Sequence, residues 1–261
     1  MAKYTRFITL GDSMTEGMCD DIVDGHYRGW ADRVADVLAE NNPGFTYFNL
    51  AIRGKLLHQV IADQIPIAKR YIEGKQTLLS FNAGANDVLR PNYKPEKAMA
   101  EYRAAVEELS QTGATLLLFT AIESVDGTGK AADLWRERFG AFNENVRAVA
   151  VEHGAILAEA KRAPFLADKR FLDQDRLHLN QEGHRRFAQG VQEVLDLPYD
   201  KSWDIPLPPA MKKNPVVEKA ENAKWIITFV LPWIWRRLRG KSSGDGRSAK
   251  HFAPVSWPPR S

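Results

Sequence analysis

Disulfide bonding within the chain is excluded, because its 261 residues contain one cysteine, Cys19. A chain without disulfides fits a reducing compartment. The first twenty residues also lack a secretory signal, since their short apolar run is followed by glycines and acidic residues. Towards the other end, residues 225–235 are eleven uncharged residues interrupted by Pro232, too few to cross a bilayer. We therefore expect a cytoplasmic protein with no transmembrane helix.

Net positive charge is absent from most of the chain. Residues 1–200 contain 24 Lys and Arg against 29 Asp and Glu, a net charge of −5, whereas residues 201–261 contain 12 against 4, a net charge of +8. Binding of nucleic acid needs a positive face, so an acidic body argues against nucleic acid as its main ligand. Only the carboxyl-terminal part has the charge to attract an anionic surface.

Five apolar runs rich in Ile, Leu, Val and Phe are predicted to be buried strands, at residues 6–10, 45–52, 77–81, 115–122 and 155–157. Apolar residues at helical spacing predict helices between them and after the last one, around residues 30–38, 99–109, 135–149 and 187–194. Fully apolar strands that alternate with amphipathic helices favour an α/β fold, in which helices cover both faces of a parallel sheet.

The composition changes near residue 200, where we place the end of the first domain, residues 1–200. Residues 201–240 are predicted to form a Pro-rich and amphipathic extension, because several prolines preclude regular structure at its start. Residues 241–261 are polar and rich in Gly, Ser and Pro. This composition predicts a disordered basic tail.

The first apolar run stops at Gly11, Asp12 and Ser13, which fits either a nucleophile or a simple turn at a strand end. In parallel sheets, ligands bind beyond the carboxyl ends of the strands. Asp175 and His178 are expected to reach that edge from a loop. A serine becomes nucleophilic when an imidazole takes its proton and a carboxylate orients the imidazole. Ser13, His178 and Asp175 are therefore the candidate catalytic residues.

Acyl transfer also needs donors for the oxygen that becomes negatively charged. The candidates are the N–H groups of Ser13 and Gly54 and the side-chain amide of Asn86, because all three residues follow predicted strands. A turn role for Gly54 and a helix-capping role for Asn86 are the structural alternatives. The sequence contains no P-loop and no H-E-x-x-H motif, so we expect neither a metal nor a cofactor.

Four short blocks, in this order, resemble the SGNH hydrolases, also called GDSL esterases and lipases. They are GDSMTEG at 11–17, NLAIRG at 49–54, GAND at 84–87 and DRLH at 175–178. The residues that give the family its name fall on Ser13, Gly54, Asn86 and His178. The resemblance implies a flavodoxin-like α/β/α sandwich with a five-stranded parallel sheet, and it makes residues 1–200 the catalytic domain. It also implies a Ser-His-Asp triad that includes Asp175, and hydrolysis without a metal.

These observations favour a serine ester hydrolase that acts on carboxylic esters or thioesters, with a small-molecule ester or a lipid as substrate. An acyltransferase with the same triad is an alternative, and so is a noncatalytic membrane-associated binding protein. The sequence leaves the acyl chain length, the natural substrate and the oligomeric state open.

Two features of the carboxyl-terminal part need separate interpretation. Residues 240–244 read GKSSG and match the G-x-S-x-G nucleophile elbow, but no strand precedes them and no helix follows, so Ser242 is not expected to react. Residues 225–241 combine tryptophans with basic residues. They are predicted either to cover the enzyme body or to make weak contact with an anionic membrane as a peripheral anchor.

Overall fold

A computed structural model describes residues 3–40, 42–123, 128–211 and 214–257. Its central sheet has the strand order β7-β6-β5-β1-β4-β8. Five strands are parallel, namely β1 (Arg6–Gly11), β4 (Thr46–Asn49), β5 (Thr77–Asn82), β6 (Thr115–Phe119) and β7 (Ile156–Ala158). The sixth, β8 (Val255–Ser256), runs antiparallel to β4. The predicted α/β sandwich is confirmed, with six strands instead of five.

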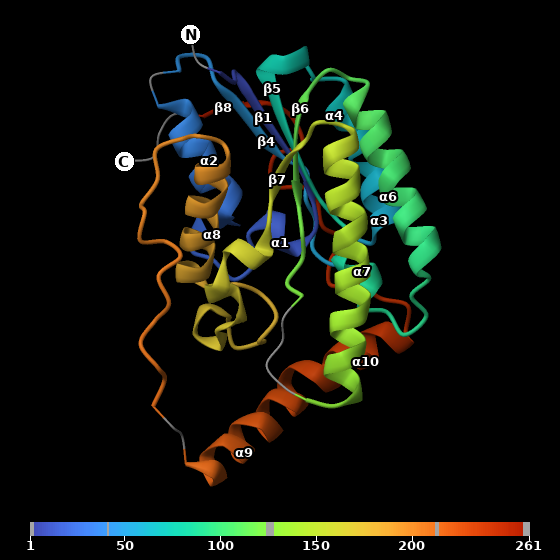
Figure 1. The fold of residues 1–261 in the computed structure, drawn as a ribbon, viewed down its shortest axis with the longest axis vertical. Coiled ribbons are helices and arrows are strands. Elements are labelled where there is room, and N and C mark those ends of the chain that lie inside the picture. Colours follow the sequence, from blue (N-terminus) through green and yellow to red (C-terminus); the bar gives the residue numbers. More distant parts are fainter. Residues whose placement is uncertain (1–2, 41, 124–127, 212–213, 258–261) are drawn as a thin grey trace.

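Helices cover both faces of this sheet (Figure 1). One face packs on α2 (Gly29–Ala39) and α8 (Gln181–Val194). The other face packs on α3 (Leu57–Asp63), α4 (Ile65–Lys69), α6 (Pro95–Ser110) and α7 (Lys130–Glu152). These helices contain the four segments whose apolar spacing predicted them. Because side chains alternate along a strand, neighbours such as Phe7 and Ile8 enter opposite cores.

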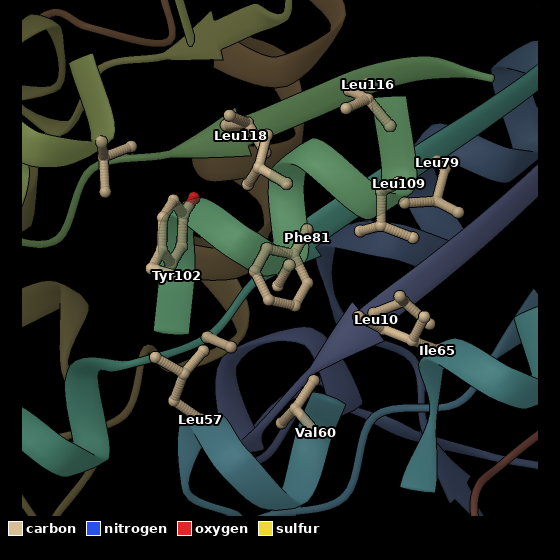
Figure 2. Packing of buried hydrophobic residues seen from close by; sticks show 14 of the residues in the cluster. Leu10, Leu57, Val60, Ile65, Leu79, Phe81, Tyr102, Leu109, Leu116 and Leu118 are labelled. Carbon is tan, nitrogen blue, oxygen red and sulfur yellow. The ribbon is translucent and has the colours of Figure 1, made fainter. Parts of the chain in front are cut away.

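The core beneath α3, α4 and α6 is made of aliphatic and aromatic side chains from both layers. Figure 2 shows strand residues facing helix residues there: Leu10, Leu79, Phe81, Leu116 and Leu118 against Leu57, Val60, Ile65, Tyr102 and Leu109. These side chains are almost fully buried. Their removal from water is a main source of the stability that holds the strand ends in place.

Several short elements complete the fold. They are α1 (Ser13–Glu16), the hairpin β2 (Ile22–Val23) and β3 (His26–Tyr27), α5 (Ala85–Val88), and the short 3₁₀ helices η1 (Gly74–Gln76), η2 (Ala160–Arg162), η3 (Pro164–Ala167) and η4 (Lys169–Phe171). After residue 214 the chain forms one continuous helix from α9 (Pro215–Trp225), the π-helical η5 (Ile226–Val230) and α10 (Leu231–Leu238). Within the described ranges, no helix combines the length and the hydropathy that crossing a membrane requires.

The tail, residues 241–261, was predicted to be disordered. The structure describes it through residue 257, where it packs against the body after α10, while residues 258–261 lie outside the described ranges. Lys250 Nζ lies 2.8 Å from Asp32 Oδ1, and both side chains are buried. Trp257 Nε1 donates to Asp36 Oδ1 at 2.9 Å. Composition alone did not reveal these anchors, because their partners lie more than 200 residues away on α2. The domain boundary at residue 200 stays a prediction, but one strand of the sheet, β8, comes from beyond that boundary.

Candidate active site

Ser13 is held at the end of the first strand by a tight turn. β1 ends at Gly11, which has a φ of +154°. There is no room for a side chain at this position, because a Cβ would lie 2.5 Å from the Asn82 carbonyl oxygen. Asp12 then caps α1 by accepting a hydrogen bond from the Met14 N–H at 3.2 Å. Ser13 is the first residue of this helix.

Asp175 and His178 lie on a loop closed by its own backbone. Asp173 N–H donates to the His178 carbonyl at 2.8 Å, and Arg176 N–H donates to the Asp173 carbonyl at 2.9 Å. The turn between them places Arg176 at a φ of +57°. Asp175 Oδ1 accepts from the N–H groups of Leu177 and His178 at 2.9 and 3.0 Å. This fixes the carboxylate and leaves Oδ2 directed at the imidazole.

The three candidate catalytic side chains form one chain of hydrogen bonds. His178 Nδ1 lies 2.6 Å from Asp175 Oδ2, and His178 Nε2 lies 2.9 Å from Ser13 Oγ. Burial acts to raise the pKa of Asp175, but the bond and the charge of His178 lower that pKa below its ordinary value. Asp175 is then an anion at neutral pH, which favours a proton on Nδ1 and leaves Nε2 as the acceptor.

Gly54 supplies a backbone N–H at the rim and adopts a φ of +73°, a conformation that favours glycine. Among the described residues, neither the Gly54 N–H nor the Ser13 N–H donates to an acceptor within the protein. The tail covers the other side of this turn, because Ser242 Oγ donates to the Gly54 carbonyl at 3.2 Å. A Cβ on Gly54 would overlap that hydroxyl.

The Asn86 amide lies at the same rim but is engaged within the protein. Its Nδ2 donates to Asp12 Oδ2 at 3.0 Å and to the Lys55 carbonyl at 3.1 Å. Burial raises the pKa of Asp12 to about 6, and the bonds from Met14 and Asn86 offset only part of this effect. The Asp12–Asn86 bond therefore joins the first and third blocks through a carboxyl group that titrates near pH 6.

The sequence analysis missed an ion pair that supports the Gly54 turn. Glu16 binds the Arg53 guanidinium and accepts the Arg53 backbone N–H at 2.6 Å, so α1 is joined to the loop after β4. The Arg53 guanidinium carbon also lies 5.2 Å from the centre of the Tyr27 ring. The position of these charged residues inside the first two blocks was a sequence signal for a role at the site. A single sequence does not show that Glu16 and Arg53 pair with each other.

One cluster among the described residues has the composition of a metal site. Cys19, Asp175 and His178 offer ligand atoms within 4.8 Å of one another. Asp175 and His178 are already bonded to each other, and burial together with the nearby carboxylates raises the pKa of the Cys19 thiol above its ordinary value. A protonated thiol is a weak metal ligand. The expectation of a metal-independent site stays a prediction.

His184, six residues after His178, lies apart from the site in α8. It is fully buried, and its Nε2 lies 3.0 Å from the Met18 carbonyl oxygen. Burial lowers the pKa of His184 to about 4. It therefore belongs to the core and takes no part in the hydrogen-bond chain of the site.

Solved structures share the architecture. The similar folds include an α/β hydrolase enzyme from the metagenome of Lake Arreo (TM-score 0.61, 20% identity, 75% of this chain and 97% of that one). An acetylxylan esterase from Geobacillus stearothermophilus gives a TM-score of 0.61 at 19% identity, over 77% and 100% of the two chains. An esterase, EstA, from a Pseudoalteromonas species gives 0.58 at 15% identity, over 74% and 97%.

Comparison of the sequence with curated proteins finds no match. The family comparison does: residues 9–186 match the GDSL-like lipases and acylhydrolases. The match spans more than half of the chain and contains all four blocks. The chain therefore belongs to the GDSL-like lipase/acylhydrolase family.

Proposed function

We propose that this protein is a serine ester hydrolase that works through an acyl-enzyme intermediate. Membership of the GDSL-like family supports ester hydrolysis in general. The observation that carries the mechanism is the continuous hydrogen-bond chain from Ser13 Oγ through His178 to Asp175, with distances of 2.9 and 2.6 Å. Serine needs this arrangement to become a nucleophile at neutral pH.

In the first half of the reaction, Ser13 Oγ attacks the ester carbonyl carbon while His178 Nε2 takes the hydroxyl proton. His178 then returns this proton to the leaving alcohol as the bond between carbon and the alcohol oxygen breaks. In the second half, water attacks the acyl-serine, with His178 again taking and returning a proton. The products are a carboxylic acid and free Ser13. Asp175 holds the imidazole in the required tautomer throughout.

The negative oxygen of each tetrahedral intermediate is proposed to bind the N–H groups of Ser13 and Gly54. Asn86 is the third proposed donor, and its part requires one hydrogen now bonded to Asp12 or Lys55 to be shared with the oxyanion. Removing a single such donor from a serine hydrolase typically costs about 3 to 4 kcal/mol of transition-state stabilisation.

The decisive experiment is labelling with a fluorophosphonate, followed by identification of the modified residue. Wild-type protein should be labelled at Ser13, and Ser13→Ala should lose both labelling and hydrolysis of nitrophenyl acetate. Ser110→Ala, which changes a half-buried serine at the end of α6, is the control and should keep both. Full hydrolysis by Ser13→Ala would refute the mechanism, and an unlabelled wild-type protein would favour a noncatalytic role.

A series of nitrophenyl esters from acetyl to palmitoyl would then define the acyl length. Product analysis with added alcohols would separate hydrolysis from acyl transfer, because a transferase forms a new ester in place of the free acid.

A further inference from the structure

The helix formed by α9, η5 and α10 has a row of large apolar side chains that face solvent. This row, called here the apolar stripe, consists of Ile227, Leu231, Ile234, Trp235 and Leu238, with exposed fractions of 65%, 52%, 41%, 55% and 76%. Successive members are separated by three or four residues, apart from the adjacent Ile234 and Trp235, so they occupy one side of the helix. A contiguous exposed apolar patch of this kind marks an interaction surface.

The carboxyl-terminal half of the same helix has an excess of positive charge. Between Glu221 and Asp245 the sequence contains five basic residues and no acidic one. Lys224, Arg236 and Arg239 are exposed. The Arg239 guanidinium carbon lies 4.3 Å from the centre of the Trp235 ring, which places a cation beside the apolar stripe. Tryptophan and arginine in this combination are suited to the boundary between acyl chains and lipid phosphates.

The opposite side of the helix is fastened to the loop that carries Asp175 and His178. Trp225 Nε1 donates to the Asp175 carbonyl at 2.8 Å. Arg176 donates to Asn222 Oδ1 at 2.6 Å and lies 5.0 Å from the centre of the Trp225 ring. In Figure 1 the helix crosses the end of the molecule towards which the parallel strands run. A surface that binds the apolar stripe would therefore face the rim on which Ser13 lies.

A large cleft separates part of this helix from the body. It has a volume of about 1050 Å³ and is lined by Phe165, Phe171, Leu207, Met211, Trp225 and Phe229, among others. Neither Ser13 nor His178 lines it. The helix thus faces the body with the side that carries Trp225, and the exposed apolar stripe lies on the other side, where a lipid surface can reach it.

We propose that this helix binds the surface of an anionic lipid bilayer, with the apolar stripe inserted among the acyl chains and the neighbouring arginines at the phosphates. The acidic body, with a net charge of −5 over residues 1–200, is repelled by such a surface. Attraction confined to the helix fixes the orientation of the bound enzyme. This binding does not depend on the proposed hydrolysis, because it involves none of the reacting groups.

The test is sedimentation of the full chain with phosphatidylcholine vesicles that contain phosphatidylglycerol, compared with vesicles of phosphatidylcholine alone. Wild-type protein should bind the anionic vesicles at least about tenfold more tightly, and binding should fall between ~0.05 and ~0.5 M salt. The variant Ile227→Ser/Leu231→Ser/Leu238→Ser should lose at least about tenfold in affinity. Arg236→Glu/Arg239→Glu should lose binding to anionic vesicles most strongly at low salt.

The matched control is Ile22→Ser/Val151→Ser, which removes apolar side chains that are 68% and 83% exposed elsewhere on the molecule. It should bind like wild type. Circular dichroism and hydrolysis of a soluble ester confirm that each variant is folded. Absence of binding by wild-type protein, or equal binding by the stripe variant, would overturn the proposal. So would a wild-type dimer in solution that the stripe variant converts to a monomer, since the stripe would then bind a second copy.

Discussion

At the residue scale, Gly54 combines a backbone requirement with a packing requirement. Its φ of +73° disfavours any residue with a Cβ, and the Ser242 hydroxyl occupies the space where that atom would lie. Gly25 has a similar φ of +81° but no heavy atom within 4 Å of its virtual Cβ. The two glycines therefore separate conformational strain from steric overlap.

Gly54→Ala should destabilise the protein by about 1 to 3 kcal/mol more than Gly25→Ala, because both changes add strain and only the first adds overlap. It should also lower kcat, since the Gly54 N–H is a proposed oxyanion donor. Urea denaturation and ester hydrolysis measure the two effects. Ser242→Gly in the Gly54→Ala background should restore part of the stability, and equal losses for the two glycine variants would contradict the packing account.

Asp175→Asn tests the orientation of the imidazole without changing the shape of the loop. The amide can still accept from the Leu177 and His178 N–H groups, but it no longer favours the required tautomer. We expect kcat to fall by roughly 10³- to 10⁴-fold with little change in the unfolding free energy. Asp133→Asn, an exposed aspartate on α7, should keep full activity. A fall of less than tenfold in Asp175→Asn would reject the proposed role.

His184 should leave a pH signature on stability. Its pKa of about 4 in the fold lies below the ordinary 6.5, so the unfolded chain binds more protons between these values and stability rises with pH there. His184→Gln should cost stability at pH 7 through lost packing. Relative to wild type, this cost should shrink by about 2 kcal/mol at pH 5, because only wild type then has to release a proton on folding.

The measurement is urea denaturation of both proteins from pH 5 to 7.5. Asp12, whose raised pKa makes stability fall with pH from about 4 to 6, titrates in both proteins and cancels in the difference. Parallel stability curves for the two proteins would show that His184 is not the group responsible.

At the element scale, the sequence predicted the strands and helices that have an apolar repeat. It missed the elements that form because of contacts with distant residues. The parallel strands and the main helices have apolar repeats long enough to be recognised. β8 has two residues, and it pairs with β4 because Lys250 and Trp257 find carboxylates on α2. Likewise, the blocks predicted that Ser13, Asp175 and His178 come together, as they do. They did not predict the bond between the Asn86 amide and Asp12, which joins residues 74 positions apart.

Pro232 gives a further example. The sequence suggested an interruption of the apolar segment, yet the helix continues through it. Pro232 is the second residue of α10 and follows the π-helical η5. Proline has no N–H to donate within a helix, and the shifted hydrogen-bond pattern of the preceding π-helical segment accommodates it. The continuation is what aligns the members of the apolar stripe.

The ion pair that anchors β8 can be tested directly. Lys250→Met removes the cation 2.8 Å from the buried Asp32 carboxylate and should cost about 3 kcal/mol or more. Lys97→Met removes an exposed pair with Glu101 on α6 and should cost less than about 0.5 kcal/mol. The urea midpoint measures both. A similar cost for the two variants would mean that the buried pair contributes no more than an exposed one.

At the scale of the whole molecule, the carboxyl-terminal part is a structural component of the body. It supplies the edge strand, the buried Lys250 and the hydroxyl that supports the Gly54 turn. A chain that ends at residue 240 should therefore lose about 4 kcal/mol or more of unfolding free energy, together with part of its esterase activity. A chain that ends at Trp257 is the control and should match wild type in both. Equal stability of the two truncated chains would show that the tail contacts are dispensable.

The pairing of β8 with β4 also sets an order of events during synthesis. Lys250 meets Asp32 across 218 residues of chain, so this contact cannot form until Lys250 has been synthesised. Contacts so distant in sequence are closed late in folding, after local ones. The support of the Gly54 turn comes from the same late segment, through Ser242. A nascent chain with Ser13 and His178 already in place would thus lack the bracing of the Gly54 turn, a proposed oxyanion donor, until residues 242–257 have been added and packed. Esterase activity would be delayed until then.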